Sequence, residues 1–236
     1  MRIWDIHPGY LNRQSLLGEH RELHGIVSIL VNGKKGYSRH PETMRWVDFG
    51  WALKQRHLLL AAEMSLRGYT DRSPAIIAET NSEKWPKIYI DEPYTQLQLL
   101  EIKYRNKEQG RIPLPKNAQQ LWSHHKYSVL ARDVNLYREL GRGVSYSDPR
   151  PGFEELTKVV TEVLRQPPST GGLRNALQHM WGYVSEYPPI AKGETESWSL
   201  HKLLKEIQLR SSACDERYLI SSTALSDLKP WVVTVQ

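Results

Sequence analysis

A run of four polar and charged residues, Glu19, His20, Arg21 and Glu22, lies in a segment with helical periodicity. An arginine can bind a phosphate through two parallel hydrogen bonds, and a nearby carboxylate can move protons or stabilise a cationic sugar. A solvated helix face, stabilised by neighbouring opposite charges, has the same composition and is more common. The quartet is therefore compatible with ordinary helix surface or with a site that acts on a phosphodiester-linked sugar.

Nine histidines raise the question of a bound metal ion. His20 and His24 lie four residues apart and could place two imidazoles on one helix face. In the zincin motif a glutamate directly follows the first histidine, and here Arg21 takes that position. The pair His124-His125 has no spacing that is distinctive of a metal site. We interpret these residues as helix histidines and predict neither a metal nor a cofactor.

Motifs of several other enzyme classes are missing from the sequence. It has no nucleophile-elbow pattern G-x-S-x-G, and Gly141-Arg142-Gly143 lacks the lysine and the spacing of a phosphate-binding loop. The chain carries 32 Lys and Arg against 26 Asp and Glu, for a net charge of +6. This excess favours polyanionic partners, although many ordinary proteins are equally basic.

Cysteine usage and hydropathy bear on the compartment. Cys214 is the single cysteine, so no internal disulfide can form, and this fits a reducing cytoplasm. The sequence contains no run of eighteen apolar residues, so it predicts no membrane span. Its first residues lack the features of a secretory signal. We expect a cytoplasmic protein without a membrane partner.

Glycine and proline divide the first half of the chain into helices. An extended strip up to His7-Pro8-Gly9 precedes a helix over 12–30, and Pro41 can begin a second helix. The segment 46–67 is apolar around most of its girth, which indicates a buried central helix. Residues 70–92 are typical of a long loop, and 94–109 of another amphipathic helix.

The stretch RIPLPKN at 111–117 has two prolines and no helical period, which suits a linker. A short strand is conceivable at 231–235. The fold class is all-α, with two helical domains, 1–113 and 118–236, joined by this linker. Further helices are predicted over 118–131, 133–143, 151–166, 172–185 and 199–210.

Several strings in order give the first half a family resemblance. M-R-I-W at 1–4 precedes His7-Pro8 and Tyr10-Leu11, and H-R-E-L at 20–23 precedes V-N-G-K at 31–34. The family's buried helix is similar to LKQRHLLLAAEMSLRGY at 53–69. Its last helix is similar to YIDEPYTQL together with the following RNKEQGRIP. Residues 1–113 thereby resemble the pyrimidine-dimer DNA glycosylase/AP lyase of ultraviolet repair, the endonuclease V type.

The resemblance implies a covalent mechanism. In that family the free α-amino group attacks C1′ of the damaged nucleotide, expels the base and forms an imine, and β-elimination then breaks the strand. An α-amine is a neutral nucleophile in useful proportion near neutral pH. Arg2 is too bulky for ordinary methionine removal, so the amine here is that of Met1, and the essential glutamate corresponds to Glu22.

The resemblance also implies a DNA-facing surface. Two arginines that hold phosphates in the family correspond to Arg2 and Arg21, and Gln14 falls on the same surface. We add the basic loop of Lys34, Lys35 and Arg39 as nucleic-acid-binding residues. The chain departs from the family at a further arginine and a histidine, which correspond to Gly25 and Ser15, and it lacks the aromatic C-terminal tail.

The second half resembles another family. HHKYSVLARDVNLYRELGRGV at 124–144, NALQHMWGYV at 175–184 and DERYLISSTALSD at 215–227 are similar to the YbgA-type helical domain of unknown function. Its matching residues could line a polar groove or could act as helix caps and interhelical hydrogen-bonding groups. The candidate groove residues are His125, Lys126, Arg138, Gln178 and His179.

These resemblances predict a DNA repair glycosylase/AP lyase whose partner is damaged duplex DNA. Two alternatives stay open: a non-catalytic DNA- or RNA-binding protein, and a modified-nucleobase enzyme centred on the C-terminal domain. The sequence leaves open the lesion, the ligand of the second domain and the oligomeric state.

Overall fold

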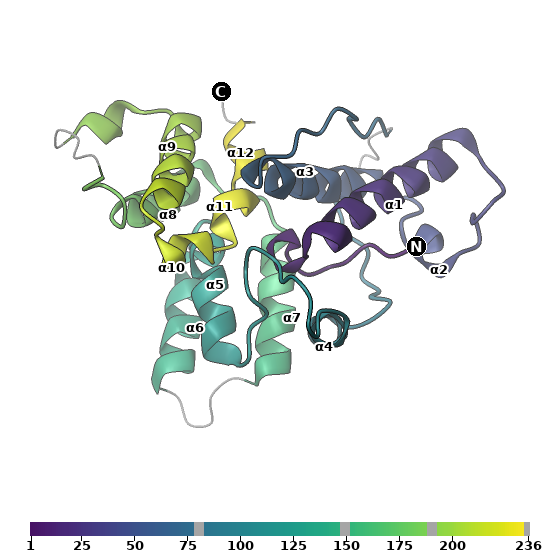
Figure 1. Cartoon of the computed structure of the whole chain (residues 1–236), viewed down its shortest axis with the longest axis horizontal. Helices are drawn as coiled ribbons and strands as arrows, with labels where there is room; N and C mark the ends of the chain where they lie inside the picture. The colour runs from purple at the N-terminus through teal and green to yellow at the C-terminus, as the bar shows by residue number, and fades with distance from the viewer. Residues whose placement is uncertain (78–82, 147–151, 188–192, 234–236) are drawn as a thin grey trace. The chain divides into compact units, whose positions relative to one another are not determined.

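The computed structural model describes residues 1–77, 83–146, 152–187 and 193–233. Within these ranges the chain is all-α, as the sequence predicts, and no sheet forms. The chain divides into two compact units, Met1–Gly110 and Arg111–Gln236 (Figure 1). None of the helices in these ranges has the length and apolar character that a bilayer crossing requires.

The first unit begins with an extended strip and a single 3-10 turn. The Asn12 side chain accepts a hydrogen bond from the backbone of Ser15 and so begins the first long helix, and Gly33 ends it in the left-handed region at φ 60°. This confirms the helix that the sequence predicts over 12–30. The elements are η1 (Pro8–Tyr10), α1 (Arg13–Asn32), α2 (Pro41–Arg45), α3 (Gly50–Leu66) and α4 (Pro93–Lys103).

The central helix α3 packs along α1 (Figure 1). It begins at Gly50 rather than at 46, because Trp46 and the three residues after it form turns that follow α2. Its buried side chains include Arg56, His57 and Glu63 besides the apolar residues. A helix that looks apolar in sequence therefore carries three polar groups into the interior, where each needs a partner.

The long loop predicted at 70–92 has no helix in its described residues. Gly68, at φ 81°, turns the chain at the end of α3, and the backbone amide of Tyr69 donates to the Met64 carbonyl at 2.9 Å. Helix α4 ends at Lys103, earlier than the predicted 109, and Asn106 at φ 60° follows in the left-handed region.

The second unit includes the segment predicted as a linker. Arg111 donates through its guanidinium to the carbonyls of Ile220 and Ser222, and Ile112 is completely buried, so 111–117 does not behave as a free tether. The prediction of a short strand at 231–235 is wrong for residues 231–233, because they belong to a helix that ends at Val233. The rest of that segment lies outside the described residues. The elements are α5 (Ala118–Leu130), α6 (Val134–Tyr146), α7 (Phe153–Leu164), α8 (Thr170–Trp181), η2 (Glu194–Ser197), α9 (Leu200–Ala213), α10 (Arg217–Ile220), α11 (Ala224–Asp227) and α12 (Lys229–Val233).

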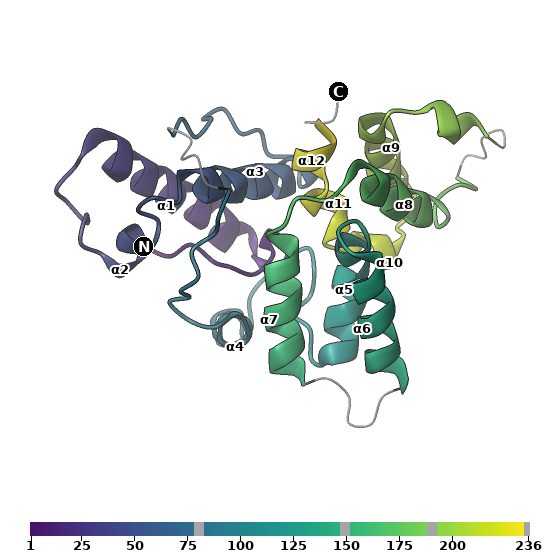
Figure 2. The same ribbon diagram turned by 180° about the vertical axis from the view of Figure 1, so that it is seen from behind.

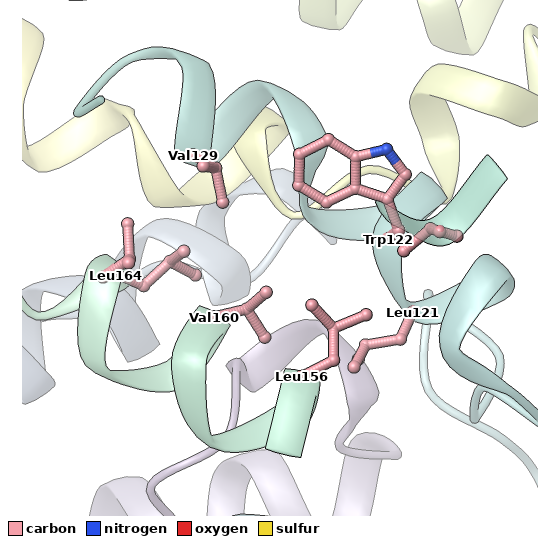
Figure 3. Packing of buried hydrophobic residues seen from close by; sticks show 8 residues of the cluster. Leu121, Trp122, Val129, Leu156, Val160 and Leu164 are labelled. Atoms are coloured by element: carbon pink, nitrogen blue, oxygen red, sulfur yellow. The ribbon is translucent and has the colours of Figure 1, made fainter. Parts of the chain in front are cut away.

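The core of the second unit lies between α5, α6 and α7, which stand side by side (Figures 1 and 2). Figure 3 shows Trp122 beside the aliphatic side chains of α5 and α7 that fill this layer. The start of α8 approaches α5 so closely that a Cβ on Gly172 would stand 2.1 Å from the Ala131 carbonyl oxygen. The buried cluster consists of Leu121, Trp122, Val129, Val144, Leu156, Val160, Val163 and Leu164.

Candidate active site at the chain's first residue

The extended strip at residues 2–6 is held by side chains rather than by a neighbouring strand. All five of its backbone N–H groups donate to side-chain oxygens, which replaces the ladder that an extended segment normally needs. The strip lies alongside α1 and brings the N-terminus beside α2 (Figures 1 and 2). The acceptors are Glu22 for Arg2, Glu42 for Ile3, Glu19 for Trp4 at 3.1 Å, and Gln96 for Asp5 at 2.7 Å and Ile6 at 3.4 Å.

Two buried ion pairs hold the strip and one of its acceptors in place. Arg56 of α3 forms a double hydrogen bond with Glu19, Nε to Oε1 at 2.7 Å and Nη2 to Oε2 at 3.0 Å, and its Nη1 donates to the Ile6 carbonyl at 2.9 Å. Arg45 of α2 pairs in the same way with Asp5. Burial raises the pKa of Glu19, and the Arg56 charge and hydrogen bonds work against that rise.

The Glu22 carboxylate lies directly against the first peptide group. The backbone N–H of Arg2 donates to Glu22 Oε2, and the α-amino nitrogen of Met1 is three covalent bonds from that same N–H. Both Met1 and Glu22 are half-buried. The structure therefore brings together the two residues to which the resemblance assigns the chemistry.

The side chain of Arg2 is held by residues other than Glu22. Its guanidinium binds the Asp91 carboxylate and stacks over the Trp4 ring, 4.2 Å from the ring centre. Arg2, which the resemblance predicts to bind a phosphate, is thus already held by a carboxylate and an aromatic ring. Its remaining guanidinium N–H groups could donate to a phosphate.

The face of α1 around Glu22 is open. Gly18 and Gly25 stand four residues before and three residues after Glu22, and a Cβ at either position would meet nothing within 4 Å. Gln14 and Arg21 on this side of the helix are exposed. A row without side chains beside a carboxylate allows close approach of a flat, bulky ligand.

The basic loop after α1 is exposed at Lys34, Lys35 and Arg39. Lys34 donates to the Ser28 hydroxyl at 2.7 Å. Tyr37, which the sequence reasoning missed, is 71% exposed in the middle of this loop at φ 57°. Aromatic rings between cations are typical of surfaces on which nucleic-acid bases stack. The position of this tyrosine between basic residues could therefore have indicated its role from the sequence.

The comparisons with known proteins address this unit directly. Residues 1–77 match the family model of pyrimidine dimer DNA glycosylases. The resemblance that the sequence showed is confirmed over these residues, which contain Met1, Glu22 and the open face of α1. The match supports a DNA repair glycosylase that acts on pyrimidine dimers and binds DNA as its substrate.

A second family model matches part of the second half. Residues 126–197 match a family described as "Protein of unknown function (DUF1722)", which agrees with the resemblance seen in the sequence. Searches of curated proteins and of solved structures found no match to the chain.

The candidate groove residues of this DUF1722-like unit have different environments. His125 is buried, and burial lowers its pKa to about 3. Arg138 of α6 and Gln178 and His179 of α8 are exposed. A groove shared by these side chains stays a prediction.

Lys126 has surroundings that the sequence reasoning did not identify. Its Nζ lies 4.7 Å from the ring centre of Tyr127 and 4.6 Å from that of Tyr218. Tyr183 stacks on Tyr218 at 5.3 Å and accepts a hydrogen bond from the Tyr127 hydroxyl at 3.2 Å. Burial raises the pKa of Tyr127 and that of Tyr218. The lysine is therefore part of an aromatic cluster formed by residues distant in sequence.

The glycosylase-like unit adds His57 and Asp71, which the sequence reasoning did not identify, to the pair of His20 and His24. His20 and His24 of α1 meet His57 of α3 and the carboxylate of Asp71. Burial lowers the pKa of His20, and it lowers that of His57 to about 4.

Proposed function

We propose that the chain is a DNA glycosylase with AP-lyase activity on pyrimidine dimers or related base lesions. The nucleophile is the α-amino group of Met1, and Glu22 is the essential carboxylate. The hydrogen bond from the Arg2 amide to Glu22 is the observation that carries this proposal, because it holds the first peptide group against a half-buried carboxylate. The family match over 1–77 supports it.

The reaction begins when the neutral amine of Met1 attacks C1′ of the damaged nucleotide. The bond between C1′ and the base breaks, and the base leaves with the bonding electrons and takes up a proton. The nitrogen then forms an imine with C1′ as the sugar ring opens. Loss of a proton from C2′ expels the 3′ phosphate, and water hydrolyses the imine to free the amine.

Glu22 has two tasks in this sequence. Its negative charge stabilises the cationic sugar and the iminium, and its oxygens can move the proton that leaves C2′. Its hydrogen bond to the Arg2 amide keeps the carboxylate within reach of the nitrogen that reacts. The half-buried position limits water around the charge, which strengthens its effect.

Access to C1′ requires distortion of the duplex. Unstacking a base costs about a few kcal/mol, and less at a lesion that stacks poorly. The side-chain-free row of Gly18 and Gly25 gives the displaced nucleotide room beside Glu22. Arg21 and the basic loop at Lys34 and Lys35 can hold the flanking phosphates.

Borohydride trapping on DNA that contains an abasic site tests the proposal. An untagged chain whose intact mass shows Met1 as the first residue should give a covalent protein–DNA adduct, because borohydride reduces the imine. The control is a chain that carries Gly-Ser ahead of Met1, which moves the amine away from Glu22 and should bind DNA without forming the adduct. No adduct from the untagged chain would reject the mechanism.

Binding and activity measurements on the same chain separate the two alternative functions. DNA or RNA binding without an adduct, and without preference for a lesion, would favour the non-catalytic binding protein. Activity that depends on His179 and not on Glu22 would favour a modified-nucleobase enzyme in the second unit.

A further inference from the structure

Three imidazoles and a carboxylate converge at one point of the glycosylase-like unit. His20 and His24 stand one turn apart on α1, His57 comes from the facing helix α3, and Asp71 follows the turn at Gly68. One ligand atom from each residue lies within 4.8 Å of the other three. The first and the last of these residues, His20 and Asp71, are 51 positions apart in sequence (71 − 20), so only the packing of α3 on α1 unites them.

Three of the separations are close to the edge length of a metal-centred tetrahedron, and all four ligand atoms lie within 4.8 Å of one another. His20 Nε2 lies 3.4 Å from His24 Nε2 and 3.4 Å from Asp71 Oδ1, and His57 Nε2 lies 3.3 Å from Asp71 Oδ2. For a tetrahedral zinc ion at about 2.0–2.1 Å from each ligand, neighbouring ligand atoms are about 3.3 Å apart.

One ring nitrogen of this cluster has no hydrogen-bond partner in the part of the chain that the structure describes. The two Nε2 atoms of His20 and His24 face each other, and each neutral imidazole has one N–H and one lone pair. His57 Nε2 is buried without a hydrogen-bond partner among the described residues, since its approach to Asp71 lacks hydrogen-bond geometry. An unpartnered ring nitrogen in the interior costs free energy, and a cation at the centre would remove this cost.

We propose that His20, His24, His57 and Asp71 bind one Zn²⁺ ion. Neutral imidazole and carboxylate are ligands that zinc prefers, and four ligands from the protein are typical of a structural rather than a catalytic zinc site. The single aspartate offsets half of the ion's charge, and each imidazole in its neutral form has a lone pair that can face the ion.

The outer contacts of the ligands support this assignment. The backbone amide of Ser73 donates to Asp71 Oδ1 at 2.9 Å, and His57 makes a hydrogen bond with the Ser73 backbone. Because His57 Nε2 has no such partner, Nδ1 is the atom that meets Ser73. Hydrogen bonds of this kind orient the rings and carboxylates of metal ligands.

The zinc site lies on a different side of α1 from the proposed catalytic carboxylate. Glu22 is two residues from both His20 and His24, which places it about 160° away around the helix. The ion would therefore tie α1, α3 and the segment at 71–73 together without touching the reaction. The proposal stands or falls independently of the imine mechanism.

Zinc binding can be measured on the untagged full-length chain after removal of metals with a chelator. Elemental analysis and titration with Zn²⁺ against a chromophoric chelator should show one ion per chain, with a dissociation constant below a micromolar. Co²⁺ in the same site should give the intense visible absorption of a tetrahedral ion. The thermal midpoint of the glycosylase-like unit should rise with Zn²⁺, because only the folded chain offers the site.

Two ligand variants and two control variants identify the site. His24→Gln and His57→Asn should each weaken Zn²⁺ binding at least about 100-fold, since even outer contacts of metal ligands are worth 10–100-fold. His201→Gln, an exposed histidine of α9, and Glu22→Gln should keep the affinity of the original chain within about twofold.

Two results would overturn the assignment. One is the absence of stoichiometric binding by the original chain, which does not depend on whether a variant folds. The other is equal Zn²⁺ affinity in His24→Gln and in the original chain, which would mean adventitious binding elsewhere.

Discussion

The backbone amide of Arg2 donates a hydrogen bond to the carboxylate of Glu22, twenty residues further along the chain. The first peptide group is thereby held against the first long helix, and the amine that precedes it is held with it. Four further amides of the strip donate to side chains in the same manner. Ordering an extended segment in this way is costly in conformational entropy, and the position of Met1 beside Glu22 supports the role proposed for its amine.

Replacement of Glu22 by Gln should separate chemistry from binding. The amide can still accept the hydrogen bond of the Arg2 amide but carries no charge, so we expect trapping and strand cleavage to fall by about 100-fold or more. Affinity for lesion-containing DNA, measured by fluorescence anisotropy, should change less than about threefold. Glu101→Gln, an exposed carboxylate of α4, is the matched control. Equal losses of binding and cleavage would contradict the assigned role.

Two substitutions of different size at Gly25 test the open face of α1. Gly25→Ala should raise the free energy of unfolding by about 0.5–1 kcal/mol, because glycine is unfavourable inside a helix, and it should leave cleavage nearly unchanged. Gly25→Leu should stabilise the helix similarly yet reduce cleavage about tenfold or more, since its side chain would occupy the space beside Glu22. Thermal unfolding and cleavage assays check both. Full activity of Gly25→Leu would mean that DNA approaches elsewhere.

The buried pair of Glu19 and Arg56 should dominate the stability of the glycosylase-like unit. Arg56→Met leaves Glu19 buried without its partner, and we expect a loss of about 3–5 kcal/mol in urea unfolding. Arg105→Met, at an exposed site, should cost far less.

The same variant has a predicted pH dependence. Burial already raises the pKa of Glu19, and Arg56 opposes that rise. Without Arg56, the folded chain binds a proton at higher pH than the unfolded chain, so its stability falls as pH rises through that interval. The loss caused by Arg56→Met should therefore be larger at pH 8 than at pH 5. The opposite order would contradict a buried, charged Glu19.

Acid should destabilise the DUF1722-like unit through His124 and His125. Burial lowers the pKa of His124 to about 4 and that of His125 to about 3, from the ordinary 6.5. The unfolded chain takes up protons below pH 6.5 and the folded chain does not, so stability is complete above that pH and falls between 6.5 and about 4. His124 alone should account for about 3 kcal/mol.

Thermal unfolding of the original chain and of His124→Gln, at pH 7.5 and pH 5, measures this term. The variant should lose less stability between the two pH values. His201→Gln is exposed on α9 and should behave as the original chain does. An unchanged pH dependence in His124→Gln would show that this histidine is not held neutral.

Arg21 should contribute to DNA binding through charge rather than through base recognition. Arg21→Gln should weaken binding to all duplexes by a similar factor and lower the slope of log K against log salt by about one. Lys107→Gln, another exposed cation of the same unit, should leave the slope unchanged. An effect of Arg21→Gln on lesion preference without a change in slope would assign it a different contact.

The sequence by itself determined the all-α class, most helix boundaries and both family resemblances. Caps and stops such as Asn12 and Gly33 act within a few residues, and the strings that carry the resemblance are local in the same way. It also predicted Met1 and Glu22 as catalytic residues, because the resemblance assigns them roles by position in the chain, and this assignment stays a proposal.

Only the tertiary structure decided which distant residues meet. The periodicity of 46–67 indicated burial but not that Arg56 and His57 would be buried with it, since a side chain's partner depends on the helix it faces. The side chains that hold residues 2–6 come from α1, α2 and α4. The cluster of His20, His24, His57 and Asp71 arises from the packing of α3 on α1. Burial of a polar group is costly unless another element supplies a hydrogen-bonding partner, and a single sequence without a fold does not specify that partner.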